Sequence, residues 1–299
     1  MELSRREVLL TALAGAAAGA MAADTLPKVR IGKWDFSRLI VGGNPVSGNS
    51  HVSGALSREM TDYFTAAKVK QLLRDCEAAG INTWQSRGDR HIMRLLHEYR
   101  LEGGNIQWIA QTASEHADIP RNIQMIADMK PAGIYHHGSA TDKFWQAGKI
   151  EQAHEMLKVM RQTGVLVGLG THIPEVVDYV EEKGWDLDFY MTCIYNLSRT
   201  KEEASKLAGQ PVDDELFWDP DREKMLARVR RTAKPCLIFK VYAASRHSDT
   251  PERMLAALRL AARFAKPTDC FVVGMFPKYK EQVRENRRLV VEAMSTQRT

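Results

Sequence analysis

Histidine is the residue type whose distribution first indicates chemistry in this sequence. Of nine histidines, six follow apolar segments that we interpret below as strands, namely His51, His91, His116, His136, His137 and His172. Neutral imidazoles bind transition metals and also transfer protons near neutral pH. We therefore predict His136, His172, His51 and His91 as ligands of a divalent transition metal. The alternative is that His136 and His172 only hydrogen-bond a substrate.

Lys240 is the second candidate for chemistry, because it interrupts the apolar run CLIFKVY (236–242). Burial lowers the pKa of a lysine, and a neutral amine can form a Schiff base with a carbonyl substrate. The sequence thus predicts Lys240 as a catalytic residue beside His136 and His172. The alternative is a structural lysine that pairs with a carboxylate.

Uncharged and cationic hydrogen-bonding side chains accompany these candidates at other predicted strand ends. They are Gln85, Arg87, Gln111, Tyr195 and Asn196, and we predict that they bind substrate. Such groups suit hydroxyls or a carboxylate, which indicates a small polar substrate such as a sugar derivative or a hydroxy acid.

The elements that must position these residues alternate between strand and helix. After a hairpin at 28–36, predicted strands lie at 38–44, 81–86, 106–112, 132–137, 165–170, 186–195, 236–242 and 270–275, each followed by an amphipathic segment. Near-continuous apolar strands between amphipathic helices indicate a parallel sheet covered by helices. Eight such units predict a (β/α)8 TIM barrel, whose chemistry sits at the carboxyl ends of its strands. A doubly wound sheet is the alternative, although no GxGxxG follows the first strand.

Composition limits the remaining function classes. The 299 residues carry a net charge of +5 with lysine and arginine spread among the acids, and only four cysteines are present. We expect neither a nucleic-acid partner nor a disulfide scaffold. We predict one barrel domain over 24–299 with a loop insertion at 199–219, either a substrate lid or surface decoration.

The N-terminal segment indicates export. Arg5 and Arg6 precede a soft Ala/Gly-rich stretch that ends in an A-x-A sequence at 20–22, as in a twin-arginine signal. We predict a signal peptide at 1–23, recognition by the twin-arginine machinery, and a periplasmic or extracellular location. The stretch is too short and too weakly apolar for a stable membrane anchor. A cytoplasmic protein with a helical extension is the alternative.

Several segments resemble the aldo/keto reductases. RLIVGGN (38–44), GINTWQS (80–86), YHHG (135–138), GTHIPE (170–175), IYNLSR (194–199) and GMFPKYKEQVRENRRLV (274–290) are similar to that family's strands and last helix. The resemblance implies the barrel with a hairpin floor and His136 as the active-site histidine. It also implies an NADP(H) groove formed by Tyr242, Lys278, Gln282, Glu285 and Asn286.

The catalytic residues of that family are replaced here. Gln85 stands at the position of its aspartate, Arg90 at its tyrosine and Gln111 at its lysine. An amide cannot supply the carboxylate's charge, and arginine does not donate protons near neutrality. Our leading hypothesis is therefore an exported enzyme of this type that acts on a small carbonyl, sugar-derived or hydroxy-acid substrate without the standard NADPH mechanism, with a metal as a possible aid. The alternatives are an NADP(H)-dependent oxidoreductase with an altered proton donor and a non-catalytic solute-binding barrel.

Overall fold

In the computed structural model, the first element of the described residues is a short antiparallel hairpin. The structure describes residues 25–295, so the predicted signal segment at 1–23 lies outside the described residues. β1 (Lys28–Ile31) pairs with β2 (Trp34–Ser37), with Ile31 opposite Trp34. Gly32 adopts a φ of +57° in the turn between them, a conformation that costs glycine little.

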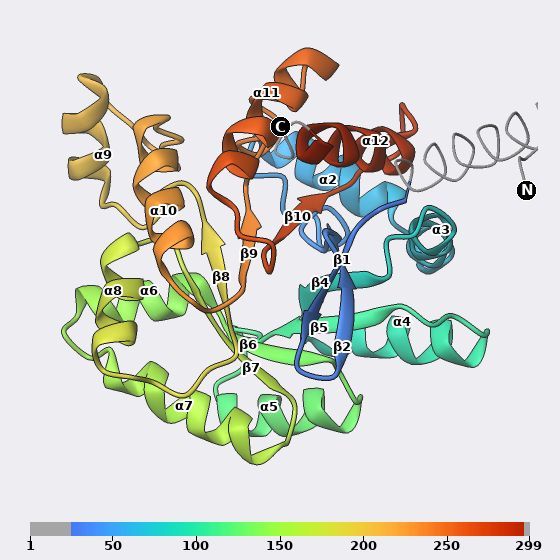
Figure 1. The fold of residues 1–299 in the computed structure, drawn as a ribbon, viewed down its shortest axis with the longest axis horizontal. Helices are drawn as coiled ribbons and strands as arrows, with labels where there is room; N and C mark the ends of the chain where they lie inside the picture. Colours follow the sequence, from blue (N-terminus) through green and yellow to red (C-terminus); the bar gives the residue numbers. More distant parts are fainter. Residues whose placement is uncertain (1–24, 296–299) are drawn as a thin grey trace, which may run out of the picture.

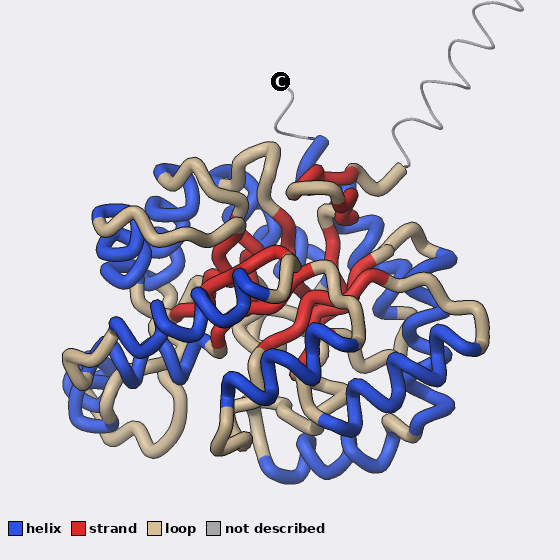
Figure 2. The backbone as a smooth tube through the Cα atoms, turned by 90° about the horizontal axis from the view of Figure 1, so that it is seen from below, coloured by secondary structure: helices blue, strands red, loops and turns tan. Residues whose placement is uncertain are grey.

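Eight parallel strands follow and close into a barrel, which confirms the predicted fold class (Figure 1). They are β3 (Leu39–Gly42), β4 (Thr83–Arg87), β5 (Gln107–Gln111), β6 (Gly133–His136), β7 (Leu166–Thr171), β8 (Phe189–Cys193), β9 (Cys236–Phe239) and β10 (Cys270–Gly274). The strand order around the barrel is the chain order, and β10 pairs with β3 to close it. Figure 2 shows these strands inside a ring of helices.

The helices of the described residues lie in the predicted alternation, with some segments divided differently. They are α2 (Gly54–Tyr63), α3 (Ala66–Ala78), α4 (Arg90–Leu101), α5 (Ile119–Asp128), α6 (Gly138–Gln146), α7 (Glu151–Gln162), α8 (Pro174–Glu182), α9 (Lys201–Ala208), α10 (Pro220–Arg231), α11 (Pro251–Phe264) and α12 (Gln282–Ser295). The amphipathic segment after the predicted strand at 132–137 forms two helices, α6 and α7. None of the helices formed by residues 25–295 is long and apolar enough to span a membrane.

Two apolar clusters explain why the sequence adopts this arrangement. The larger cluster fills the space between the strands and the helices, and the smaller one fills the barrel interior beneath its open end. The interior cluster contains Ile40, Tyr135 and Phe189 from the barrel together with Phe36 from the hairpin. The hairpin therefore closes the amino-terminal end of the barrel, and the opposite end is free to form a site.

Candidate functional site

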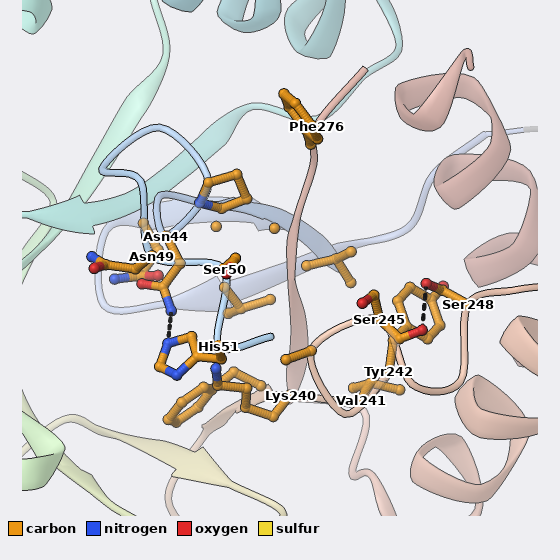
Figure 3. A pocket seen from close by; sticks show the side chains of 18 of the residues that line it. Asn44, Asn49, Ser50, His51, Lys240, Val241, Tyr242, Ser245, Ser248 and Phe276 are labelled. Carbon is orange, nitrogen blue, oxygen red and sulfur yellow. Dashed lines mark hydrogen bonds between the residues drawn. The ribbon is translucent and has the colours of Figure 1, made fainter. Parts of the chain in front are cut away.

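A cavity of about 460 Å³ opens at the carboxyl ends of the barrel strands. Eight of its lining residues form what we call the reactive end: His51, Gln85, Arg87, Gln111, His137, His172, Glu215 and Lys240. Figure 3 shows His51 and Lys240 close together at this end. Of the residues predicted for the site, Gln85, Arg87, Gln111, His172 and Lys240 line this cavity.

A hydrogen-bonded chain of neutral groups forms part of the cavity wall. Gln85 Nε2 donates to the hydroxyl of Tyr135 over 2.8 Å, and that hydroxyl donates to Gln111 Oε1 over 2.8 Å. Burial raises the pKa of Tyr135, so the phenol stays neutral. Three strands of the barrel are thus joined by one network, and each amide holds a fixed position at the cavity.

His172 is held by a buried carboxylate. Its Nδ1 lies 2.6 Å from Asp142 Oδ2 on α6, and Asp142 also accepts hydrogen bonds from the hydroxyls of Thr171 and Ser198 and from the His172 backbone N–H. This bond places the ring proton on Nδ1. Within residues 25–295, Nε2 of His172 has no hydrogen-bond partner, so it is free to meet a ligand in the cavity that the residue lines. An imidazole oriented in this way can accept and return a proton.

Close packing of backbone at the end of β7 brings this imidazole to its place. A Cβ on Gly138 would lie 3.2 Å from His172 Cε1, and a Cβ on Gly170 would lie 2.9 Å from the Gly138 nitrogen. Only glycine allows β7 and the start of α6 to approach so closely. Asp142, one turn into α6, consequently reaches His172.

Lys240 follows β9 and is mostly buried, which lowers the pKa of its amine from 10.5 to about 8. Its backbone φ is +66°, in the left-handed region, so the residue leaves the strand direction and does not continue the strand as predicted. The Nζ lies 5.7 Å from the centroid of the Phe217 ring. At pH 7 about one in ten such amines is neutral, against about one in three thousand for an unperturbed lysine.

The insertion after β8 contributes directly to the cavity. Beyond α9, Glu215 reaches across to His51, whose Nδ1 lies 2.7 Å from Glu215 Oε2. Burial would raise the pKa of Glu215, but the hydrogen bond from His51 and the charges of His51, Lys240 and His172 lower it. Phe217 packs under the guanidinium of Arg246, 4.1 Å from the ring centroid. This contact geometry supports the lid interpretation over surface decoration.

His136, which we predicted as a catalytic residue and a metal ligand, does not line the cavity. Tyr135 points into the barrel interior, and side chains alternate along a strand, so His136 faces α6. There its Nδ1 lies 2.8 Å from the Thr141 hydroxyl, and its ring stacks on Phe144. Burial lowers its pKa to about 4. His137 lines the cavity instead, and burial followed by the nearby charges of His172 and Arg87 lowers its pKa to about 4 as well.

The four predicted metal ligands do not converge. His51 and His172 line the cavity, whereas His136 faces α6 and His91 is exposed in the first turn of α4. No group of three or more histidine, cysteine, aspartate or glutamate side chains in the described part of the chain has the geometry of a metal site. The described residues therefore do not fit the predicted ligand set.

The other predicted residues divide between the cavity and its surroundings. Tyr195 and Asn196 lie outside it: the Tyr195 hydroxyl donates to Asp219 over 3.2 Å, and Asn196 lines a separate groove beside the insertion. Tyr242, Gln282 and Asn286 line the cavity, whereas Lys278 pairs with Glu59 and Glu285 pairs with Lys280. Three of the five residues predicted for an NADP(H) groove thus line the cavity, and the other two form ion pairs.

Sequence reasoning missed four residues of the site, namely Tyr135, His137, Asp142 and Glu215. The alternation of β6 could have indicated His137 once Tyr135 was recognised as interior. Asp142 and Glu215 carry no sequence signal, because each meets its histidine only through the folded chain.

Comparison with known proteins shows the fold alone. No family model matches the chain, and no curated protein matches it. Among solved structures, it is similar to a truncated 3-deoxy-D-arabino-heptulosonate 7-phosphate synthase from Thermotoga maritima, with 11% identity, a TM-score of 0.51, and coverage of 91% of this chain and 90% of that one. It is also similar to 7,8-dihydropteroate synthase from Vibrio fischeri ES114, with 11% identity, a TM-score of 0.51, and coverage of 91% and 99%.

The chain is a TIM barrel. At these identities, the similarity does not carry over a substrate or a reaction. The resemblance of its motifs to aldo/keto reductases is not supported by these comparisons, so the function must be argued from the cavity.

Proposed function

We propose that this protein is an enzyme that activates a small polar carbonyl compound as an iminium ion on Lys240 and moves a proton at the adjacent carbon through His172. The observation that carries the proposal is the presence of Lys240, whose pKa is lowered to about 8, in the same cavity as an imidazole held by Asp142. The reaction class is that of lyases and isomerases that act next to a carbonyl.

The chemistry follows from the two groups. The neutral amine of Lys240 attacks the carbonyl carbon, a C–N bond forms, and water leaves to give the iminium. The positive nitrogen then withdraws electrons from the adjacent carbon, so His172 Nε2 can take a proton from that carbon. Alternatively, Nε2 can accept the proton of a hydroxyl on the next carbon, while the bond between these two carbons breaks and the hydroxyl-bearing fragment leaves as an aldehyde or ketone. Returning the proton and adding water restores the amine and releases product.

The other groups at the reactive end support this chemistry. Gln85 and Gln111 offer amide hydrogen bonds to hydroxyls, and Arg87 adds a positive charge that is shared with Glu115 and Asp89. The lid residue Glu215 adds a carboxylate whose charge acts on Lys240. A small hydroxylated carbonyl compound meets a partner for each of its polar groups in this arrangement.

Reductive trapping tests the proposal. The protein is incubated with borohydride and glyceraldehyde, dihydroxyacetone or pyruvate, and its peptides are analysed by mass spectrometry. We expect the peptide that contains Lys240 to gain the mass of one carbonyl compound less one oxygen atom, and Lys240→Met to abolish the gain. Lys278→Met, which alters an exposed lysine paired with Glu59, is the control and keeps it. Modification spread evenly over exposed lysines would refute the proposal.

An NADP(H)-dependent oxidoreductase is the second candidate, because Tyr242, Gln282 and Asn286 line the same cavity. In that case the nucleotide would supply hydride, and His137 or His172 would hold the proton for the carbonyl oxygen. NADPH binding can be measured by fluorescence quenching at nucleotide concentrations up to the millimolar range. Quenching by the unchanged protein that is lost in Asn286→Leu would favour this candidate. A protein that binds carbonyl compounds without trapping or turnover would instead be a solute-binding barrel.

We further propose that the protein is exported through the twin-arginine pathway. The basis is the paired Arg5 and Arg6 before an Ala/Gly-rich stretch. Replacing both with lysine should retain the protein in the cytoplasm, as measured by fractionation of the producing cells. Unchanged fractionation would argue for the cytoplasmic alternative.

A further inference from the structure

The cavity continues beyond the reactive end to a second group of residues. This part, which we call the tail subsite, is lined by Tyr242, Ser245, Ser248, Phe276, Gln282 and Asn286. Figure 3 shows Tyr242, Ser245 and Ser248 grouped along the wall away from His51. The loop after β9 carries Lys240 at its start and Tyr242 two residues later, so the two parts share a wall.

Two buried polar atoms in the tail subsite have no partner among the described residues. They are the hydroxyl of Tyr242, a residue that is 9% exposed, and Oδ1 of Asn286, a residue that is 2% exposed. The Asn286 amide nitrogen donates to the Gln282 carbonyl over 2.8 Å, and Gln282 Oε1 accepts from the Phe276 N–H over 2.7 Å. Asn286 is thus oriented with its acceptor oxygen left over. An unsatisfied buried polar group destabilises the folded protein, and a hydrogen bond to a ligand hydroxyl would relieve this cost.

The backbone beside these residues is held in an uncommon conformation. Ala243, Ala244 and Ser245 have consecutive φ values of 50°, 49° and 76°, although none of them is glycine. The left-handed region is unfavourable for residues other than glycine, because the Cβ crowds the following carbonyl oxygen. Hydrogen bonds from Ala243 N–H to the Lys240 carbonyl and from His247 N–H to the Tyr242 carbonyl maintain the turn. Strain of this kind is concentrated at binding sites, and here it fixes the wall of the tail subsite.

The charges around the tail subsite select the ligand chemistry. Lys280 lines the cavity here, but its Nζ lies 2.9 Å from Glu285 Oε2, so its charge is already balanced. Arg246, on the same loop, donates to the His51 carbonyl and stacks on Phe217. A phosphate or carboxylate placed here would find no uncompensated cation among the described lining residues. A neutral hydroxyl both donates and accepts, and therefore matches Asn286 Oδ1 and the Tyr242 hydroxyl together.

We propose that the tail subsite binds the neutral, hydroxylated tail of the carbonyl substrate. This inference rests on the proposed function and narrows its substrate to polyhydroxylated carbonyl compounds, such as open-chain sugars, without a phosphate at the far end. The carbonyl would lie at Lys240 and the hydroxyls would extend toward Asn286 and Tyr242.

Calorimetry with ribitol, a polyol without a carbonyl, tests the tail subsite independently of Lys240. We expect ribitol to bind, and Tyr242→Phe to weaken its binding about tenfold, because each hydrogen bond of this kind contributes about 1.4 kcal/mol or less. Tyr279→Phe removes the hydroxyl of an exposed tyrosine and is the matched control, for which no change is expected. Asn286→Leu is the second variant and should also weaken binding, provided that its circular dichroism matches that of the unchanged protein.

Trapping of short and long carbonyl compounds completes the test. Tyr242→Phe should lower the trapping of ribose on Lys240 and leave that of glycolaldehyde unchanged. The inference would be overturned if ribitol bound equally well to the unchanged protein and to both tail variants. It would also be overturned if NADPH or ribose 5-phosphate bound at the tail subsite in preference to ribitol. If no carbonyl compound is trapped but ribitol binding still depends on Tyr242, the proposed function fails and the tail subsite stands.

Discussion

The lowered pKa of Lys240 predicts that this residue destabilises the folded protein. Between about pH 8 and pH 10.5, the ordinary pKa of a lysine, the unfolded chain holds a proton that the folded chain lacks, so stability rises with pH in that window. Below pH 8 the full cost is present, and above 10.5 it disappears. Since one pKa unit corresponds to about 1.4 kcal/mol, the cost near pH 7 is at most about 3 kcal/mol.

Lys240→Met removes this cost while keeping a side chain of similar length. We expect the variant to be more stable than the unchanged protein near pH 7, with the gain shrinking by up to about 3 kcal/mol as the pH approaches 10.5. The change in packing is independent of pH, so the pH dependence of the difference isolates the amine. Urea unfolding followed by tryptophan fluorescence near pH 7, 9 and 10.5 measures it.

Lys278→Met is the matched control for this experiment. Lys278 is exposed at the surface, and its hydrogen bonds to Glu59 and Tyr279 raise its pKa. Its removal should therefore give no stabilisation near pH 7. A stability difference between Lys240→Met and the unchanged protein that does not vary with pH would refute the assignment of a lowered pKa to Lys240, and with it the main support for iminium chemistry.

Three other substitutions separate proton transfer from iminium formation and from folding. Asp142→Asn should keep trapping on Lys240 but slow deuterium exchange at the carbon next to the carbonyl by about 10²-fold or more. NMR measures this exchange, and equal exchange rates in the two proteins would count against the role of His172. Gly138→Ala places a Cβ 3.2 Å from His172 Cε1, so the same exchange should slow while trapping continues; loss of both would indicate general unfolding. His136→Ala should lower the free energy of unfolding by about 2 kcal/mol, because it removes a buried side chain and its hydrogen bond. Trapping on Lys240 should persist in this variant. Loss of trapping in a folded His136→Ala protein would show that His136 takes part in the reaction.

The barrel was predictable because most of its strands are short, largely apolar runs, such as LIVG in β3 and CFVVG in β10. All four residues of β3 are buried, as are the first four of β4, and that pattern differs clearly from the spaced apolar positions of the helices between them. The carboxyl ends of parallel strands meet at one face, so Gln85, Gln111 and Lys240 could be placed together without knowledge of any contact. The rule that located them uses only element order, which the chain displays directly.

The partners of the histidines could not be predicted in the same way. Asp142 lies 30 residues before His172 and Glu215 lies 164 residues after His51. Both acids lie outside the strands, in α6 and in the loop beyond α9. Their spacing in the sequence therefore carries no period that could reveal the pairs, although these pairs orient both imidazoles.

The choice between His136 and His137 illustrates how a one-residue error changes the chemistry of a strand end. The resemblance to another family selects His136 by its position in the motif. Side chains along β6 alternate between the two faces of the sheet, however, and Tyr135 faces the barrel interior. That side chain is buried in the barrel interior, where its hydroxyl joins Gln85 and Gln111. The neighbouring His136 must then bond Thr141 outside the barrel, and His137 takes the place at the cavity. Where adjacent residues are chemically alike, the interior residue before them determines which one can meet a substrate.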